Sequence, residues 1–205
     1  MKSEKDSGQS NAINTGFTHA TGEVFAYLNS DDLLIAPDTL TRVASFFRSY
    51  PDVGVLQGHT FVIDAQDRIT GMAAAIPFSM RDRVIGIFGI PQQATFWRRD
   101  VYEAVGGFNE ANPTCMDGEF YVRAALAKKS FACVDEVLAA FRVHSESISG
   151  SQRLGKVYRE HLGRVANMTG EKNIGRFERM ARNIRAKLIR AYAMARHHPA
   201  FVLRR

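Results

Sequence analysis

A short apolar run that ends in two acidic residues is the strongest constraint on how this chain folds. The run Val24–Leu28 is followed at once by Asn29-Ser30-Asp31-Asp32, and its length and composition predict a buried strand. The two carboxylates then lie at the carboxyl end of that strand, where open α/β sheets bind their ligands. Such a pair suits a divalent cation that in turn holds a diphosphate. The alternative is a turn with a helix cap, because Asp and Asn are favoured in both and Pro37-Asp38 opens a helix just after.

Further along the chain, strand-like and helix-like patterns alternate. Residues 65–68 predict a hairpin-type turn, and residues 72–91 a loop or short helix, because Pro and Gly interrupt an apolar segment there. This alternation predicts an α/β domain with a mostly parallel sheet and flanking helices. Helical patterns cover residues 10–20, 38–50, 100–105 and 120–127, and strand patterns cover residues 53–56, 59–63, 92–98, 131–134 and 137–144.

The distribution of charge divides the chain into two parts. Residues 1–150 carry 13 Lys and Arg against 18 Asp and Glu, whereas residues 151–205 carry 14 against 3. We therefore predict a main domain at residues 1–150 and a basic helical appendage at residues 151–205. The chain has no apolar run of about 18 residues, its first residues are polar, and its two cysteines match neither a disulfide framework nor a zinc signature. We expect a protein of the reducing cytosol.

The appendage contains an amphipathic cationic helix at residues 176–196, with its arginines largely off the apolar face. Two interpretations stay open. The apolar stripe packs on the main domain and leaves the arginines in solvent, or the helix docks on an anionic membrane surface. No nucleic acid is expected as a partner, because the segment has no nucleic-acid motif. The apolar face consists of Phe177, Met180, Ala181, Ile184, Leu188, Ala191, Tyr192 and Ala195.

Four sequence blocks, which together span residues 6–149, resemble the inverting nucleotide-sugar glycosyltransferases of family 2. Each block alone is weak evidence, but four in this order are specific. The resemblance implies the A-type glycosyltransferase fold, a Rossmann-like α/β domain, and transfer of a sugar from a nucleotide-diphosphate sugar to a hydroxyl acceptor with inversion. The blocks are Asp6–Gly16 with Ala20–Glu23, Leu28–Asp32, Gln93–Arg99 with Gly106–Glu110, and Met116–Arg123 with Phe141–Ser149.

The resemblance assigns the acidic loop to the sugar donor. It implies that Asp31 and Asp32 hold Mn²⁺ or Mg²⁺ against the donor diphosphate, with His144 as an additional metal ligand. A structural role for His144 at the end of a strand is the alternative. Asn29 replaces the first Asp of the family's Asp-x-Asp motif, so it can hydrogen-bond a ribose hydroxyl but carries no charge. The implied donor-binding residues are Asn14, Asn29, Asp31 and Arg142.

The resemblance also implies a catalytic base and an acceptor side. Asp117 matches the family's general base, which takes the proton from the acceptor hydroxyl; its alternative role is to cap a helix. Met116 stands where the family usually has Glu. Phe96 and Trp97 alternate along a strand, so one faces the core, and we expect Trp97 to be the more exposed and to stack on a sugar ring. The implied acceptor-binding residues are Gln93, Trp97 and Glu119.

Family members begin with a strand and an Asp-bearing loop that grips the nucleotide, and nothing similar precedes Asp6. At about 30 residues per strand–helix unit, we expect about 60 residues of such a domain to be missing, and we expect this chain to bind its donor weakly. The expected product is a surface polysaccharide or related glycan, built on a glycan or lipid-linked acceptor at the inner face of the membrane. The alternative is a non-catalytic fragment that binds a partner through its basic tail.

Overall fold

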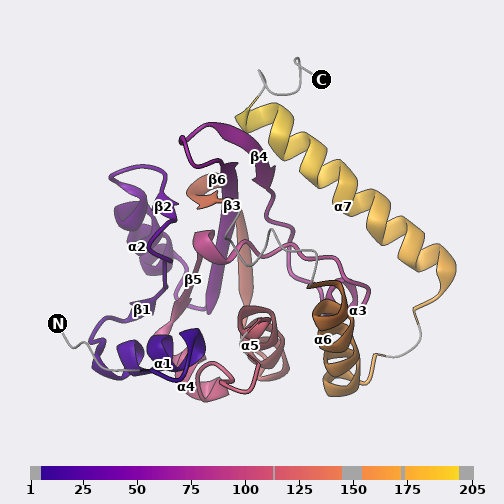
Figure 1. Ribbon diagram of the computed structural model, residues 1–205, viewed down its shortest axis with the longest axis horizontal. Helices are drawn as coiled ribbons and strands as arrows, with labels where there is room; N and C mark the ends of the chain where they lie inside the picture. Colours follow the sequence, from indigo (N-terminus) through magenta and orange to yellow (C-terminus); the bar gives the residue numbers. More distant parts are fainter. Residues whose placement is uncertain (1–5, 113, 145–153, 172–173, 199–205) are drawn as a thin grey trace.

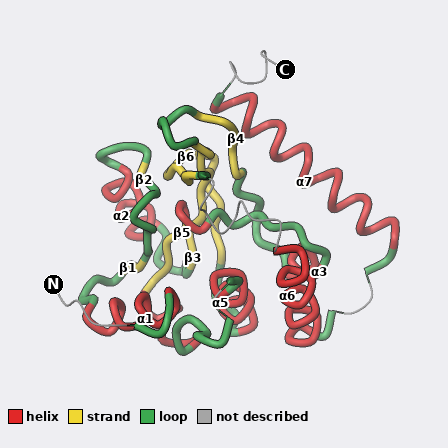
Figure 2. Tube along the Cα trace, viewed as in Figure 1, coloured by secondary structure: helices red, strands yellow, loops and turns green. Residues whose placement is uncertain are grey.

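A computed structural model describes residues 6–112, 114–144, 154–171 and 174–198. A central sheet is surrounded by helices, and the long helix α7 lies along the outside of the molecule, far from α1 and α2 (Figures 1 and 2). The helices are α1 (Gln9–His19), α2 (Thr39–Ser49), α3 (Met80–Val84), α4 (Arg99–Val105), α5 (Met116–Leu126), α6 (Leu154–Thr169) and α7 (Arg176–His197), with a short 3-10 turn at Gln92–Ala94.

The sheet has the strand order β1-β5-β3-β6-β2, and β4 pairs with the second half of β3. The longest strands, β3 and β6, pair side by side along most of their length and form the centre of the sheet. Its strands are β1 (Val24–Phe25), β2 (Leu33–Leu34), β3 (Val55–Ile63), β4 (Ile69–Ala73), β5 (Thr95–Arg98) and β6 (Phe131–Arg142).

The α/β class with flanking helices is confirmed, but the strand pairing is mixed rather than mostly parallel. Among the described strands only β3 and β6 pair in parallel, and the other four pairings are antiparallel. Because β5 is antiparallel to both of its neighbours, β1 and β3 still run in the same direction. The parallel framework of β1, β3 and β6 therefore persists with an antiparallel strand inserted into it.

Hydrophobic clusters cover both faces of the sheet. Trp97 packs with Phe108 and Phe120 on the face covered by α1, α4 and α5, whereas Phe96 packs with Phe47 on the face covered by α2. The two side chains point to opposite faces, as alternation requires, but neither face is open. The expectation that Trp97 is exposed is therefore wrong: its exposed fraction is 0%, against 2% for Phe96.

Several boundaries differ from the sequence-based expectations. The strand expected at Val24–Leu28 has only its first two residues in regular pairing. Two pairs of expected strands each form one continuous strand, β3 and β6, and the ambiguous segment at residues 72–91 contains α3. The hairpin between β3 and β4 is confirmed, with Asp67 at a positive φ of 61° in its turn. Short interruptions in an apolar pattern thus did not mark strand ends.

The basic helix α7 is oriented opposite to the first interpretation. Its polar side faces the body of the molecule: Arg182 and Arg185 bind Asp82 of α3, and Glu178 binds Arg81. Its apolar stripe faces solvent. The exposed fractions are 82% for Phe177, 55% for Met180, 50% for Ile184, 65% for Leu188 and 57% for Tyr192. The expectation that the stripe packs on the main domain is therefore wrong, because the acidic groups of the body bind the arginines instead.

Gly58 lies in β3 at an irregularity in its register with β6. A Cβ at this position would lie 2.6 Å from the Leu138 side chain and 2.9 Å from the Glu136 carbonyl oxygen. We expect Gly58→Ala to lower the free energy of unfolding by about 1–3 kcal/mol, measured by chemical denaturation. Gly71→Ala in β4 is the matched control, since its Cβ would meet nothing closer than 3.8 Å. Equal stability of the two variants would contradict this close packing.

Candidate active site

The acidic loop between β1 and β2 meets the carboxyl end of β6. The antiparallel pairing of β2 with β6 brings residues more than 100 positions apart into contact. The Asp32 carboxylate accepts a hydrogen bond from the Arg142 backbone N–H at 3.0 Å. His144 Nε2 lies 3.3 Å from Asp31 Oδ2. The three residues that the sequence suggested as metal ligands thus gather around one loop and form the acidic cluster, although their ligand atoms do not all lie within 4.8 Å of one another.

Amide side chains complete the surroundings of Asp32, which is 4% exposed. Asn29 Nδ2 and Gln93 Nε2 each donate to Asp32 Oδ2 at 3.2 Å. Burial raises the pKa of the Asp32 carboxyl and the charge of Asp31 adds to the rise, although these hydrogen bonds oppose it. Gln93, expected on the acceptor side, therefore lies in the same cluster as the donor-binding residues.

Arg142 holds this loop in place. Its guanidinium donates to the backbone oxygens of Asp31 and Asp64, both at 2.9 Å, and pairs with the Asp67 carboxylate at 2.7 Å. These contacts orient the acidic loop against the turn between β3 and β4.

The donor types of the cluster suit a divalent cation. Asp31 and His144 are half-buried, with side chains 37% and 32% exposed, and Asp32 supplies a second carboxylate beside them. Carboxylate oxygens and an imidazole nitrogen suit Mn²⁺, and the carboxylates alone suit Mg²⁺. Burial with a like charge nearby raises the pKa of Asp32, and a cation would relieve the repulsion between the two carboxylates.

Asp117 lies at the start of α5 and lines a cavity of about 390 Å³. The helix cap is Cys115, so the alternative that Asp117 caps the helix is wrong. Asp117 Oδ1 accepts a hydrogen bond from the Gly118 N–H at 2.7 Å. Burial raises the pKa of the Cys115 thiol to about 11, so it stays protonated and is not a nucleophile. The cavity is also lined by Arg83, Phe88, Ile90, Thr114, Tyr121, Tyr158 and His161.

Tyr27 links the acidic cluster to this cavity. Its pKa is raised well above the ordinary value, mainly by burial and then by the charges of Asp117, Tyr121 and Asp32. The carboxylates of Asp32 and Asp117 are therefore both close enough to act on one phenol.

Three residues of this cavity were not recognised in the sequence. Arg83 comes from α3, and Tyr158 and His161 come from α6, which belongs to the segment treated as an appendage. The available signal for Arg83 was the charged triplet Arg81-Asp82-Arg83 within an otherwise apolar stretch. No comparable local signal marks Tyr158 or His161.

Three expected site residues have structural contacts instead. Asn14 donates to the Phe108 carbonyl at 2.9 Å and accepts from the Tyr102 hydroxyl at 2.9 Å, which ties α1 to the turn after α4. Glu119 accepts hydrogen bonds from two asparagine side chains, at 2.8 and 2.6 Å. Trp97 lies in the core. Trp97 therefore has no exposed ring surface on which a sugar could stack in this structure.

A second group with metal-like composition joins α7 to the sheet. Nε2 of His59 and Nε2 of His197 lie 3.0 and 2.8 Å from the same oxygen of Asp135. However, His59 Nδ1 accepts a hydrogen bond from the Ala75 N–H at 2.9 Å. The proton of neutral His59 must therefore be on Nε2, which then donates to Asp135 and has no lone pair for a metal. This group is better described as a structural contact that fixes the C-terminal end of α7 to the sheet.

The buried His59 makes the stability of the protein depend on pH. Burial lowers its pKa below the ordinary value near 6.5, so the unfolded chain binds a proton more readily than the folded one. We expect the free energy of unfolding to fall as the pH is lowered from about 7.5 to about 5.5. Denaturant titration across this range should show a smaller fall in His59→Asn.

The pKa of His161 is also lowered by burial, so its contribution has the same sign and the dependence should shrink rather than vanish. The pKa of Asp135 is lowered, chiefly by its hydrogen bond from His197. It therefore titrates well below this pH window. An unchanged slope in His59→Asn would contradict the neutral, buried state of His59.

Comparison with known proteins defines the family. The model of glycosyl transferase family 2 matches residues 1–106, and the chain belongs to this family. An uncharacterised glycosyltransferase of Mycobacterium tuberculosis is 31% identical over 128 residues, which cover 61% of this chain and 47% of that protein. A PGL/p-HBAD biosynthesis glycosyltransferase of Mycobacterium bovis is 30% identical over 120 residues, 58% of this chain and 44% of that protein.

A glycosyltransferase of Nostoc sp., also uncharacterised, is 30% identical over 153 residues, 69% of this chain and 46% of that protein. The chain thus spans about half the length of the curated relatives it matches. The crystal structure of S. aureus TarS residues 1–349 superimposes with a TM-score of 0.53 at 13% identity, over 95% of this chain and 53% of that chain. At this identity the likeness concerns the fold, and it supports the A-type glycosyltransferase architecture.

Proposed function

We propose that the protein transfers a sugar from a nucleotide-diphosphate sugar to a hydroxyl acceptor with inversion at the anomeric carbon. This proposal rests on membership of family 2 and on two groups of side chains whose charges both act on Tyr27. One is the Asp31, Asp32 and His144 cluster, and the other is the cavity that contains Asp117. Transfer needs a site for a charged diphosphate and a base for a hydroxyl, and these two groups offer residue types suited to each.

In this proposal, Asp31, Asp32 and His144 would hold Mn²⁺ or Mg²⁺ at the donor diphosphate, and Asn29 would hydrogen-bond the ribose. The bound ion would neutralise charge on the departing diphosphate. Gln93 and the Arg142 backbone N–H orient Asp32 through hydrogen bonds. The side chain of Arg142 fixes the loop that carries Asp31.

Asp117 acts as the general base. Its carboxylate takes the proton of the acceptor hydroxyl while the hydroxyl oxygen bonds to the anomeric carbon. The bond from that carbon to the diphosphate breaks on the opposite face, and its electron pair leaves with the diphosphate. One displacement of this kind inverts the anomeric configuration. The neutral Cys115 thiol provides no nucleophile for a two-step route.

The acceptor is a glycan or a lipid-linked molecule, and the product is a surface polysaccharide or related glycan. A relative named for PGL/p-HBAD biosynthesis supports this class of product. The rival function is a non-catalytic module that binds a partner through its tail, and the exposed stripe of α7 is the observation in its favour. Substitutions in the two parts of the site distinguish catalysis from that rival.

Two isosteric substitutions should separate donor binding from proton transfer. Asp32→Asn removes a metal-binding charge, so Mn²⁺-dependent binding of nucleoside diphosphate should weaken at least tenfold in calorimetry, about 1.4 kcal/mol or more. Asp117→Asn removes the proton acceptor, so transfer should fall about 100-fold or more while donor binding is kept. Binding and transfer are both measured on this chain.

Asp38→Asn is the matched control, because Asp38 lies on the surface beside Arg42 and should change neither quantity. Near-normal transfer by Asp117→Asn would remove Asp117 from the role of base. Metal-dependent nucleotide binding that Asp32→Asn leaves intact would remove the acidic loop from the donor site.

We further propose that α7 docks the protein on an anionic membrane at its cytoplasmic face. None of the described helices is long and apolar enough to cross a bilayer, so docking would be peripheral. The stripe of Phe177, Met180, Ile184, Leu188 and Tyr192 is exposed along the helix. Apolar rings and aliphatic side chains beside cations are the features of helices that lie in the membrane interface.

The charges beside the stripe match an anionic surface. Four exposed cations follow one edge of the stripe: Arg176, Arg179, Lys187 and Arg190. The acidic residue of the same helix, Glu178, is bound by Arg81 and Arg182. Each cation near an anionic surface contributes about 1 kcal/mol to binding. This charge complementarity selects an anionic lipid surface as the occupant of the stripe.

Vesicle flotation should test this docking. We expect binding to vesicles of equal parts phosphatidylglycerol and phosphatidylcholine, and little binding to phosphatidylcholine alone. Ile184→Ser with Leu188→Ser should reduce binding at least tenfold, because burying each side chain contributes about 1.5–3 kcal/mol. Leu40→Ser is the control, since Leu40 is 58% exposed on α2. Equal binding by both variants would contradict the proposal, as would a stripe-dependent dimer of this chain in solution.

A further inference from the structure

A nearly buried arginine without a carboxylate partner lies in the cavity beside Asp117. Arg83 is 5% exposed, and its Nε has no hydrogen-bond partner. Among the described residues, none of the ion pairs involves its guanidinium, which lies 5.1 Å from the centre of the Phe88 ring. A buried cation ordinarily needs a paired anion, because removal of its charge from water is costly.

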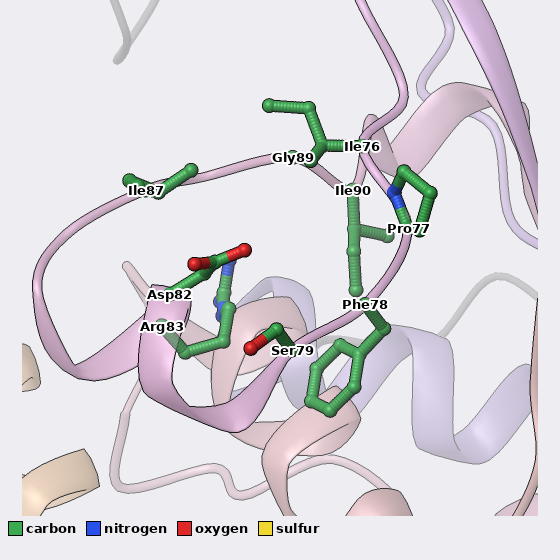
Figure 3. Close-up of a pocket in the computed structure, with 9 residues that line it drawn as sticks. All are labelled: Ile76, Pro77, Phe78, Ser79, Asp82, Arg83, Ile87, Gly89 and Ile90. Atoms are coloured by element: carbon green, nitrogen blue, oxygen red, sulfur yellow. The ribbon is translucent and has the colours of Figure 1, made fainter. Parts of the chain in front are cut away.

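The two residues that precede Arg83 on α3 both form ion pairs, so the lack of a carboxylate partner is particular to Arg83. Arg81 pairs with Glu171 at 3.0 Å and with Glu178 at 2.7 Å. Asp82 binds Arg182 at 2.9 Å and also Arg185. In Figure 3, Asp82 and Arg83 lie next to each other on α3, beside a small cavity under Ile87 and Gly89. The Asp82 carboxylate thus forms ion pairs with arginines of α7 and does not pair with Arg83.

The guanidinium is held against the first turn of α5. A Cβ on Gly118 would lie 2.5 Å from Arg83 Nη2 and 3.0 Å from His161 Nε2. Only glycine therefore lets both side chains approach the residue next to Asp117. His161 is 1% exposed, and its Nδ1 has no hydrogen-bond partner. The first turn of a helix also carries partial positive charge, so three groups favourable to an anion converge on one wall of the cavity.

We infer that this wall binds an anionic group of the acceptor, a phosphate ester or a carboxylate, while Asp117 faces the acceptor hydroxyl. The inference rests on the proposed function and adds a substrate class: an acceptor with an oxyanion near the hydroxyl that is glycosylated. Arg83 supplies a planar fork of donors suited to two oxygens of such a group. A cavity of about 390 Å³ has the size of a small-ligand site.

Asp117 itself does not take the place of this anion. It lies in the same cavity, and its charge acts on Arg83, but its Oδ1 accepts from its own helix and no ion pair joins it to the guanidinium. An incoming oxyanion would pair with Arg83 and leave the Asp117 carboxylate for the hydroxyl. Arg83 would therefore be a specificity-determining residue that touches the acceptor and not the donor.

The test uses inorganic phosphate and glycerol 1-phosphate as probes, followed by amide chemical shifts of the whole chain. Both probes should shift the amide resonances of residues 115–119, with and without saturating Mg²⁺ and nucleoside diphosphate. Arg83→Gln should weaken this binding at least tenfold, the loss expected for a hydrogen-bonded charge pair. Arg81→Gln, on the same helix, is the matched control and should bind as the unmodified protein does.

The outcomes distinguish the source of the anion. Displacement of the probes by metal–nucleoside diphosphate would assign Arg83 to the donor diphosphate and overturn the inference. Absence of shifts at residues 115–119, while metal-dependent nucleotide binding is intact, would overturn it and leave the proposed function standing. If Arg83→Gln does not fold, Arg83→Lys keeps the charge and should still weaken binding, because lysine lacks the planar fork; full affinity in that variant would also overturn the inference.

Discussion

The donor side of the site depends on the pairing of β6 with two strands at once. Its parallel pairing with β3 fixes the centre of the sheet, and its antiparallel pairing with β2 brings its carboxyl end to the acidic loop. From there the Arg142 backbone N–H reaches Asp32, and its side chain holds Asp31. Neither β1 nor β2 is longer than two residues, so these contacts supply most of the order of the loop.

Acidic residues of the body determine the orientation of the basic tail. Asp82 binds Arg182 and Arg185, and Asp135 binds Arg196 and His197. These contacts bring the cationic side of α7 inward, and only small residues such as Ala186 and Ala193 are buried on it. Because the stripe lies on the side of the helix opposite Arg182 and Arg185, the inward packing of these arginines exposes the stripe together with the cations along its edge. The exposed apolar stripe is thus a consequence of ion pairing.

The sequence predicted the parts of the site that depend on local pattern. The acidic loop follows its strand, and Asp117 begins a helix, so both could be located without the fold. Two expectations failed because they concerned tertiary surroundings. Alternation predicted that Phe96 and Trp97 point in opposite directions, but not that helices cover both faces. Periodicity predicted an amphipathic α7, but not which side the body would bind. Arg83 and His161 could not be paired from sequence, because about 80 residues separate them in the chain and each lies in an ordinary local pattern.

Helix α3 contributes to both proposed interactions of this protein, the one with a membrane and the one with an anionic acceptor. One residue of α3, Asp82, fixes α7 and so sets how the apolar stripe is presented, while the next residue, Arg83, lines the acceptor cavity. A substitution at Asp82 would free two arginines and remove a negative charge beside Arg83, so it would act on both interactions together. The stripe residues lie outside α3 and contribute only to the proposed membrane contact. Gly118 also lies outside α3 and contributes only to the proposed acceptor site. An acceptor with an anionic group and a lipid would satisfy both proposed surfaces in one molecule, since its lipid would lie in the membrane that α7 is proposed to contact while its oxyanion would reach Arg83.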